Sequence, residues 1–320
     1  MDEAQAMAQS HEDIPDERLR LIFACAHPAI DPAVRAPLIL QTVLGLDARA
    51  IASAFLVAPA AMSQRLVRAK AKIRDAGVPF ATPDLDALPE RLETVLETVY
   101  AVFTQGWADP AGAEARSRGL TGEAIWLGRL IAAILPGEPE AIGLLALMLH
   151  AQARRRARRD PQGRYVPLED QDPALWDAGL MAEAEALILK ASAMGRIGRF
   201  QLEAAIQSAH ASRAIAGHAD WEAVLLLYEA LLALTGSVVV AINRAVALAR
   251  VRGPADGLAA LDQLGADPRL ADYQPYWAAR ADLAARAGDT EGAGQAYRRA
   301  IGLETDPALR AFLQARQAAL

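Results

Sequence analysis

Residues 46–74 read LDARAIASAFLVAPAAMSQRLVRAKAKIR, and this stretch decides the fold that we expect for the N-terminal part of the chain. Asp47 is of a residue type that caps helices, and a short helical pattern follows it through Phe55. Pro59 opens a second helix, because proline is favoured in the first turn. This helix is predicted to run to about Asp75, where glycine and proline follow. The pattern therefore predicts two helices joined by a tight turn.

The second of these helices has two contrasting faces. Its apolar residues recur at helical spacing and are predicted to pack on the preceding helices; they are Met62, Leu66, Ala69 and Ile73. No acid interrupts its five bases, which are Arg65, Arg68, Lys70, Lys72 and Arg74. Such a helix is typical of a helix-turn-helix, whose second helix meets base edges in the major groove while flanking bases hold phosphates. We expect base contacts from Ser63, Gln64 and Arg68, and phosphate contacts from Arg65, Lys70 and Lys72. The alternative is a solvated basic face with no ligand.

The distribution of charge supports this interpretation. The chain of 320 residues carries 33 Lys and Arg against 39 Asp and Glu, a net charge of -6 that by itself argues against nucleic-acid binding. Counted by segment, however, residues 16–77 carry +4, residues 1–15 carry −4, and residues 78–320 carry −6. The local basic excess therefore coincides with the predicted helix-turn-helix.

Beyond this stretch, residues that begin or end helices are frequent, and patterns typical of strands are nearly absent. The sequence therefore predicts an all-α protein. Asp16 and the pair Asp31-Pro32 open two earlier helices, so that four helices fit into residues 16–77. We predict five segments: an acidic tail over 1–15, the four-helix domain over 16–77, a linker over 78–89, a helical extension over 90–195 and helical repeats over 196–320. Helices of the extension are expected at Arg91–Thr104, Gly122–Leu135, Glu138–Arg159 and Trp176–Gly195.

One pair of predicted helices in the last segment has a repeat-like spacing. Tyr276–Arg286 and Glu291–Leu303 flank a glycine turn, and the second helix carries Ala293, Tyr297 and Ala300 on one face. Small residues allow close approach of helices, and the tyrosine fills the space between them. This is the spacing of a tetratricopeptide-type repeat, so we expect such pairs in this segment.

Residues 46–74 resemble region four of bacterial sigma factors of the extracytoplasmic-function class. In that region a helix of the pattern G-L-x-x-x-x-I-A-x-x-L precedes a recognition helix that ends R-L-x-R-A-R-x-x-L. Residues 16–28, DERLRLIFACAHP, resemble one subfamily of this class, which carries a long C-terminal tetratricopeptide-like extension. Residues 163–172, GRYVPLEDQD, and 198–206, GRFQLEAAI, are similar to that extension. The resemblance thus covers nearly all of residues 16–320.

The resemblance implies a role in transcription initiation without catalysis. The four-helix domain would bind the −35 promoter element and the flap of the RNA polymerase β subunit, and the extension would serve as a regulatory or protein-interaction domain. By position, Ser63, Gln64, Val67 and Arg68 would meet the promoter edge, with Arg65 and Lys70 on phosphates. The implied partners are promoter DNA, the RNA polymerase core and a regulatory protein on the C-terminal repeats.

Two departures from the family pattern stand out. Leu56 occupies the place where many sigma factors have a turn glycine. Region two, which melts the −10 element and binds the polymerase clamp, should precede Asp16, where only fifteen residues stand. Either the sequence is a truncated version of a longer protein, or the protein does not melt a promoter alone.

The remaining candidate sites favour structural roles. Cys25 is the only cysteine, which excludes disulfides and fits a reducing cytosol; we interpret it as a core residue. Carboxylates at Glu169, Asp170 and Asp172 suit a divalent cation, but they have no EF-hand spacing, and we expect no metal site. The arginines of 154–159 lie at a predicted helix C-terminus, where cations complement the helix dipole, although nucleic-acid contact is the alternative.

We predict a cytoplasmic protein without a membrane segment, without a cofactor and without enzymatic activity. No glycine-rich phosphate loop follows a strand, and the five histidines have no metal-ligand spacing. The alternative to promoter binding is a helical-repeat scaffold, in which the helix-turn-helix serves protein contacts only.

Overall fold

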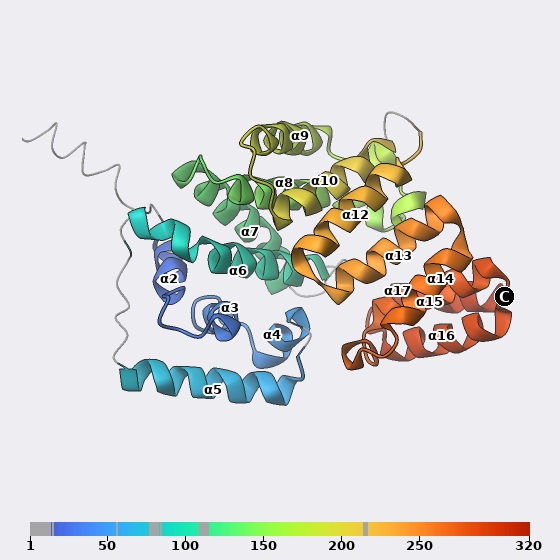
Figure 1. Cartoon of the computed structure of the whole chain (residues 1–320), viewed down its shortest axis with the longest axis horizontal. Coiled ribbons are helices and arrows are strands. Elements are labelled where there is room, and N and C mark those ends of the chain that lie inside the picture. The colour runs from blue at the N-terminus through green and yellow to red at the C-terminus, as the bar shows by residue number, and fades with distance from the viewer. Residues whose placement is uncertain are drawn as a thin grey trace, which may run out of the picture. The chain divides into compact units, whose positions relative to one another are not determined.

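The computed structural model of the chain describes residues 14, 16–55, 57–76, 83, 85–108, 115–213 and 217–320 (Figure 1). Within these ranges the elements are helices, and an isolated antiparallel bridge joins Arg159 to Tyr165 without forming a strand. The predicted all-α class is therefore confirmed. No helix in the described ranges is long and apolar enough to cross a membrane.

Several predicted features lie outside the described residues. They are the acidic tail except Ile14, residue 77, half of the linker (residues 78–82 and 84) and Leu56 in the predicted turn. The part of the linker that is described contains a 3₁₀ turn, Leu85–Ala87, which leads directly into the next helix.

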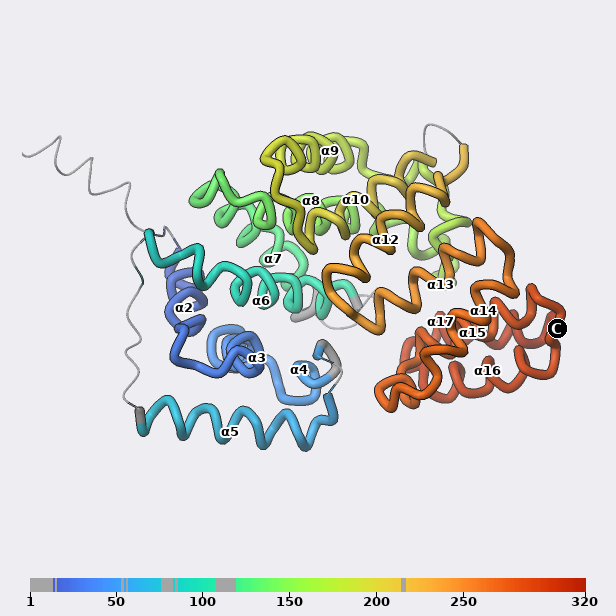
Figure 2. The backbone as a smooth tube through the Cα atoms, in the orientation of Figure 1, coloured from blue at the N-terminus to red at the C-terminus, as the bar shows by residue number. Residues whose placement is uncertain are grey.

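The chain divides into two compact units, Met1–Pro136 and Gly137–Leu320, here called the N-terminal and C-terminal units. The helices of the N-terminal unit are α2 (Glu17–Cys25), α3 (Pro32–Thr42), α4 (Ala48–Ala54), α5 (Pro59–Ala76), α6 (Leu88–Ala108) and α7 (Ala115–Ile134). Figure 2 shows these six helices at the blue and green end of the chain trace.

Local capping explains where the first helices begin. The Asp16 carboxylate accepts a hydrogen bond from the Leu19 amide at 2.8 Å, and the Asp31 carboxylate accepts one from the Ala33 amide at 3.0 Å. Each cap satisfies an amide that has no partner within the helix. The two helix starts predicted from these aspartates are therefore confirmed.

α6 joins the four predicted helices to the rest of the N-terminal unit. It contacts α2, α3 and α4, and it packs along α7. The Arg91 guanidinium donates to the Phe23 carbonyl at 2.9 Å, and the Gln105 amide donates to the Ala50 carbonyl at 3.3 Å. From α2, Arg18 pairs with Glu123 at 2.6 Å. The helices on either side of residues 78–89 thus share one compact unit.

The C-terminal unit is built from helix pairs. Its helices are α8 (Pro139–Ala153), α9 (Ala178–Ser192), α10 (Arg199–Ala211), α12 (Trp221–Thr235), α13 (Val238–Arg252), α14 (Pro254–Leu264), α15 (Gln274–Ala287), α16 (Thr290–Leu303) and α17 (Pro307–Ala318). Consecutive helices pack as α8 with α9, α10 with α12, α13 with α14, and α15 with α16, and α17 packs on α16. 3₁₀ turns at Arg155–Arg158, Leu168–Asp170 and Pro173–Leu175 lie between α8 and α9.

The repeat-like spacing predicted for α15 and α16 has the expected packing. Ala293, Tyr297 and Ala300 are buried, and Tyr297 and Ala300 share a core cluster with Ala281 of α15 and Leu313 of α17. Gly288 ends α15 at φ 87°, a conformation that only glycine adopts without strain. In the preceding pair, a Cβ on Gly257 would lie 2.5 Å from the Ala249 Cβ, so glycine permits the close approach of α14 to α13.

Several helix ends differ from the prediction; α6, for example, extends beyond both ends of the predicted Arg91–Thr104, and α9 ends at Ser192 rather than at Gly195. The helix expected to continue to Arg159 ends at Ala153, because the Asp177 amide binds the Ala153 carbonyl at 3.0 Å and turns the chain away. The helix expected from Trp176 begins at Ala178, where the Asp177 carboxylate caps the Leu180 amide. α7 begins at Ala115 rather than at the predicted glycine, since a single glycine inside a helical pattern weakens the helix without ending it.

Candidate nucleic-acid interface

The helix-turn-helix is formed by α4 and α5. The Asp47 carboxylate accepts hydrogen bonds from the amides of Arg49 at 3.0 Å and Ala50 at 2.8 Å, which confirms the predicted cap of α4. The Val57 amide binds the Ala52 carbonyl at 2.9 Å and closes the end of α4. α5 then begins at Pro59, the residue predicted from the sequence.

The apolar face of α5 packs against the preceding helices, as predicted. Met62 and Leu66 are 1% exposed, and Ala69 and Ile73 are 9% exposed, all four on the side that contacts α3 and α4. Full burial of a side chain the size of Leu or Met stabilises the fold by about 1.5–3 kcal/mol. Because this burial fixes the rotation of α5 about its own axis, it also determines which side chains point outward.

All seven predicted DNA-binding side chains are exposed on α5; they are Ser63, Gln64, Arg65, Val67, Arg68, Lys70 and Lys72. At about 100° per residue, Gln64, Val67 and Arg68 lie opposite the buried row. Arg65 and Lys72 flank them on one side, and Ser63 and Lys70 flank them on the other. A central strip of potential base readers is thus bordered by cations on both edges.

The central strip has further properties. Its three residues and the flanking Ser63 line a common shallow hollow on the surface of α5. Val67 is 68% exposed, which is unusual for a branched apolar side chain, because burying it in the core would be more favourable. The Arg68 Nε donates to the Gln64 carbonyl at 3.3 Å, so this guanidinium lies back along the helix.

The cations of α5 are nearly uncompensated. Arg74 lies 3.6 Å from Asp75 with both side chains largely exposed, a contact of small energy. The other four cations form no ion pair with any described residue. The exposed face of α5 therefore offers a row of positive charge that suits a polyanion.

One further residue of this surface was missed by the sequence analysis. Arg49 is exposed in the first turn of α4, the helix that crosses the DNA backbone in helix-turn-helix proteins. The sequence indicated this position, because Arg49 lies in the first turn after the predicted cap of the helix. Its side chain forms no ion pair with a described residue and adds one cation beside α5.

The second basic segment, residues 154–159, has different surroundings. Arg154 is 8% exposed and its guanidinium binds the Gln207 side chain, while Arg159 pairs with Asp306 at the start of α17. Burial first, and then Arg158 and Arg213, lower the pKa of Arg154 to about 10. This segment therefore has a structural role, but the contacts with Gln207 and Asp306 provide it, not the dipole of the predicted helix, which ends earlier at Ala153.

The other candidates also make structural contacts. Cys25 is buried, and burial raises the pKa of its thiol, which fits the predicted core role. The Glu169 carboxylate pairs with Arg250, and the Asp172 carboxylate caps the 3₁₀ turn at Pro173–Leu175. Among the described residues, no three His, Cys, Asp or Glu side chains come together as a metal site would require.

Comparisons with known proteins place the chain in a family. Residues 91–192 match a model described as a family of unknown function (DUF6596). An uncharacterized protein of Rhizobium meliloti (strain 1021) is 43% identical over 299 residues, which cover 93% of this chain and 70% of that protein. Identity of this extent over most of both sequences shows common descent and a common fold. The chain therefore belongs to the same family as this Rhizobium meliloti protein.

Proposed function

We propose that the chain is a sigma-factor-type transcription initiation protein, whose α4–α5 helix-turn-helix binds the −35 element of a promoter. One observation carries this proposal: the buried row of α5 turns a strip of Gln64, Val67 and Arg68 outward, with the exposed cations Arg65 and Lys72 on one side and Lys70 on the other. A helix in the major groove needs this division, because base edges lie at the floor of the groove and phosphates along its two rims.

Each side chain of the strip suits a particular contact. Arg68 is able to bind guanine through two hydrogen bonds, Gln64 to bind adenine in the same way, and the exposed methyl groups of Val67 to contact the thymine methyl. Each good bidentate contact contributes about 1–3 kcal/mol to discrimination between bases. Arg65, Lys70 and Lys72 would hold phosphates and set the register without reading sequence.

The proposal extends to the protein partners and the place of action. The N-terminal unit would dock on the flap of the RNA polymerase β subunit in the cytoplasm, and the helix pairs of the C-terminal unit would form a regulatory or protein-interaction domain. Binding to polymerase would add to the affinity of α5 for DNA, since two linked contacts strengthen one another. No catalytic step is proposed.

A selection experiment tests DNA binding. The full chain is incubated with a library of random duplexes, the bound fraction is sequenced over several rounds, and the winning duplex is titrated in a gel shift at several salt concentrations. We expect a short enriched motif and an affinity that falls as salt rises. A triple variant, Arg65→Ala with Lys70→Ala and Lys72→Ala, should abolish the shift, whereas Arg298→Ala, an exposed arginine of α16, should leave it unchanged.

A second experiment tests the role in transcription. RNA polymerase core is mixed with the chain, and with the chain fused behind a region-two domain, on a template that carries the selected motif. Co-migration with core and initiation by the fusion protein would support the sigma-type function. A chain that binds neither DNA nor core would instead be a helical scaffold, which is the alternative function for a stack of helix pairs.

A further inference from the structure

The second helices of the helix pairs differ in what they expose (Figure 1). α14 and α16, which belong to the last two pairs, expose polar and charged side chains, among them Asp256, Asp262, Glu291, Gln295 and Arg298. Such polar outer faces keep a stack of helix pairs soluble. They provide the standard against which the outer face of α12, the second helix of an earlier pair, is compared.

The exposed face of α12 is apolar along its length. Its exposed residues recur three, four or one position apart and therefore lie on one side of the helix; they are Glu222, Leu226, Ala230, Ala233 and Leu234. Leu226 is 65% exposed and Leu234 is 54% exposed. Leucine gains free energy when it leaves water, so a face that holds two such side chains favours a partner.

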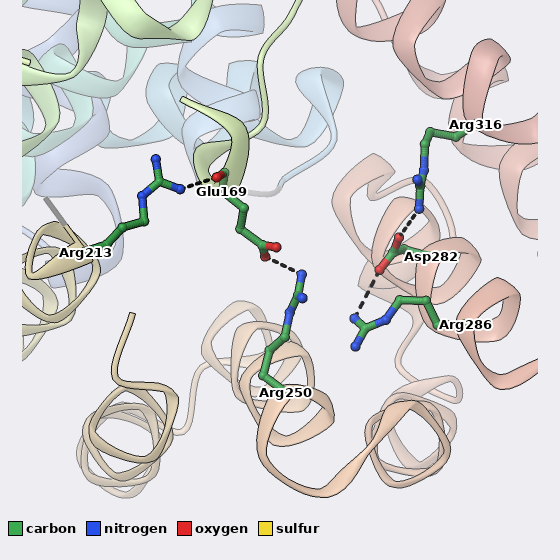
Figure 3. A network of polar contacts seen from close by, with 6 residues as sticks. All are labelled: Glu169, Arg213, Arg250, Asp282, Arg286 and Arg316. Atoms are coloured by element: carbon green, nitrogen blue, oxygen red, sulfur yellow. Dashed lines mark hydrogen bonds and ion pairs between the residues drawn. The ribbon is translucent and has the colours of Figure 1, made fainter. Parts of the chain in front are cut away.

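Another surface of the C-terminal unit shows how the chain covers its own helices. The Arg213 guanidinium donates to the carbonyls of Glu169 and Gln171, and the Glu169 carboxylate pairs with Arg250 of α13. Figure 3 shows these contacts, with a second ion network of α15 and α17 beside them. Here a connecting segment of the chain lies over helices and its charges are paired. Among the described residues, no such segment covers the leucines of α12.

The order of residues on the α12 face is symmetric. Leu226 precedes Ala230 by four positions, and Leu234 follows it by four. An antiparallel α12 of a second copy, related by a two-fold axis beside Ala230, therefore brings Leu226 of each copy against Leu234 of the other. The small side chains of the two Ala230 residues stand at the axis and allow the helices to approach closely. A face that matches itself in this way is what an isologous dimer needs.

The charges around the face favour the antiparallel arrangement. Glu229 pairs with Arg244 of α13 at 2.8 Å, next to the position of the axis, and both side chains are partly exposed. Two-fold rotation places the same pair of the second copy beside it, so that carboxylates and guanidinium groups alternate. Glu222 then lies near the start of the other copy's α13, where the helix dipole favours an anion. A parallel pair would instead bring the two Glu222 carboxylates together.

We propose that the outer face of α12 is the interface between two copies of this chain, packed antiparallel about a two-fold axis at Ala230. The four leucines of the two copies leave water on association, and the Glu229–Arg244 pairs form the rim. One helix face is small for an interface, so the dimer is reversible, with a dissociation constant on the order of micromolar or weaker. This inference does not rest on DNA binding.

Sedimentation velocity of the full chain without DNA tests the proposal. We expect the sedimentation coefficient to rise with protein concentration up to about 100 μM. Ala230→Glu places two like charges at the axis and should raise the dissociation constant at least about tenfold. Ala259→Glu, at an exposed alanine on α14, is the matched control and should leave it unchanged. Circular dichroism of both variants verifies that each remains folded.

Disulfide cross-linking tests the register. Ala230→Cys should form a linked dimer under mild oxidation, because the two thiols meet at the axis. Leu226→Cys should not link to itself, since the two positions lie about 12 Å apart along the helices, but it should link to Leu234→Cys in a mixture. Cys25 is buried and does not compete.

Several outcomes would overturn the proposal. A chain that sediments as a monomer at every concentration has no such interface, and a dimer that Ala230→Glu and Ala259→Glu weaken equally, or not at all, is held by another surface. Linkage of Leu226→Cys to itself as readily as to Leu234→Cys would exclude the antiparallel register. If Ala230→Glu lowered the thermal stability of a monomeric chain, the partner of α12 would lie within the same chain.

Discussion

Residues 65–74 and residues 154–159 both carry five cations in a short stretch, and the two stretches have opposite surroundings. On α5 the cations stand on an exposed helix face, and four of them form no ion pair with a described residue. After α8, Arg154 is buried against Gln207, and Arg159 reaches Asp306 of α17. The cations of the first stretch are therefore exposed and mostly without ion pairs, whereas Arg154 and Arg159 of the second are bound within the fold.

The difference arises from the register of apolar residues. On α5, apolar side chains recur at helical spacing, so burial of Met62 and Leu66 turns the bases outward. Residues 154–159 have only one apolar side chain, Ala157, and lie in a 3₁₀ turn between packed helices. A count of basic residues therefore does not identify a nucleic-acid interface; the apolar residues between the bases decide it.

The largest expected effect concerns the histidines beside the buried arginines. Burial, followed by Arg154, lowers the pKa of His150 to about 4, and burial with Arg154 and Arg213 does the same for His210. Between pH 6.5 and 4 the unfolded chain binds protons that the folded chain does not, so stability falls as the pH falls. At pH 5 the loss is about 2 kcal/mol per histidine relative to pH 7. Urea unfolding of the full chain, followed by circular dichroism at both pH values, measures it.

The control for this prediction is another histidine of the same unit. His150→Gln should reduce the difference in stability between pH 7 and pH 5 by about 2 kcal/mol, whereas His218→Gln should leave it unchanged, because His218 is exposed. If the stability of both variants depended equally on pH, the interior of the C-terminal unit would tolerate added positive charge. The contrast between its buried charges and the exposed charges of α5 would then weaken.

The next effect separates the two basic stretches directly. Arg154→Ala removes the partner of Gln207 and opens a cavity, so we expect the free energy of unfolding to fall by about 2–3 kcal/mol, partly offset by relief of repulsion from Arg158 and Arg213. Arg156→Ala, at an exposed position, should cost less than about 0.5 kcal/mol. Chemical denaturation gives both values. Weaker DNA binding by Arg156→Ala would contradict the structural role of this stretch.

Local chemistry explains which features of the fold were predictable. The starts of α2, α3, α4 and α5 depend on an aspartate or a proline within a few residues, so sequence alone places them. The end of α8 was mispredicted, because it depends on the Asp177 amide, beyond a connection that shows no periodicity. The contacts of Glu169 with Arg213 and Arg250 span 44 and 81 residues, and no local pattern reports such pairs.

The candidate site was predictable for the same reason. The outward face of α5 follows from a single helical register, and the burial of Leu66 and its neighbours confirms that register. What the sequence did not reveal is the surface that the connection 160–172 covers. The order in which its residues meet α17, α13 and Arg213 after α10 depends on the stacking of whole helix pairs, which no local pattern reports.

A smaller effect tests the central strip of α5. Arg68→Ala should weaken binding to the selected duplex by about 1–3 kcal/mol and relax the preference for one base pair, since the bidentate contact is lost. Binding to a scrambled duplex should change much less. Gel-shift titrations of both duplexes measure the two values, with Arg298→Ala as the control. Equal losses of affinity for both duplexes would show that Arg68 contacts phosphates and does not read a base.

The smallest effect distinguishes the flanking cations from the strip between them. Lys70→Ala should weaken binding to all duplexes alike, by about 1 kcal/mol or less at physiological salt, and should lower the slope of log K against log salt by about one unit. Lys190→Ala is the matched control, because it removes an exposed lysine of α9 in the C-terminal unit. A loss confined to the selected duplex would show that Lys70 reads bases. The same change in slope for Lys190→Ala would mean that net charge, and not the flank of α5, governs the salt dependence.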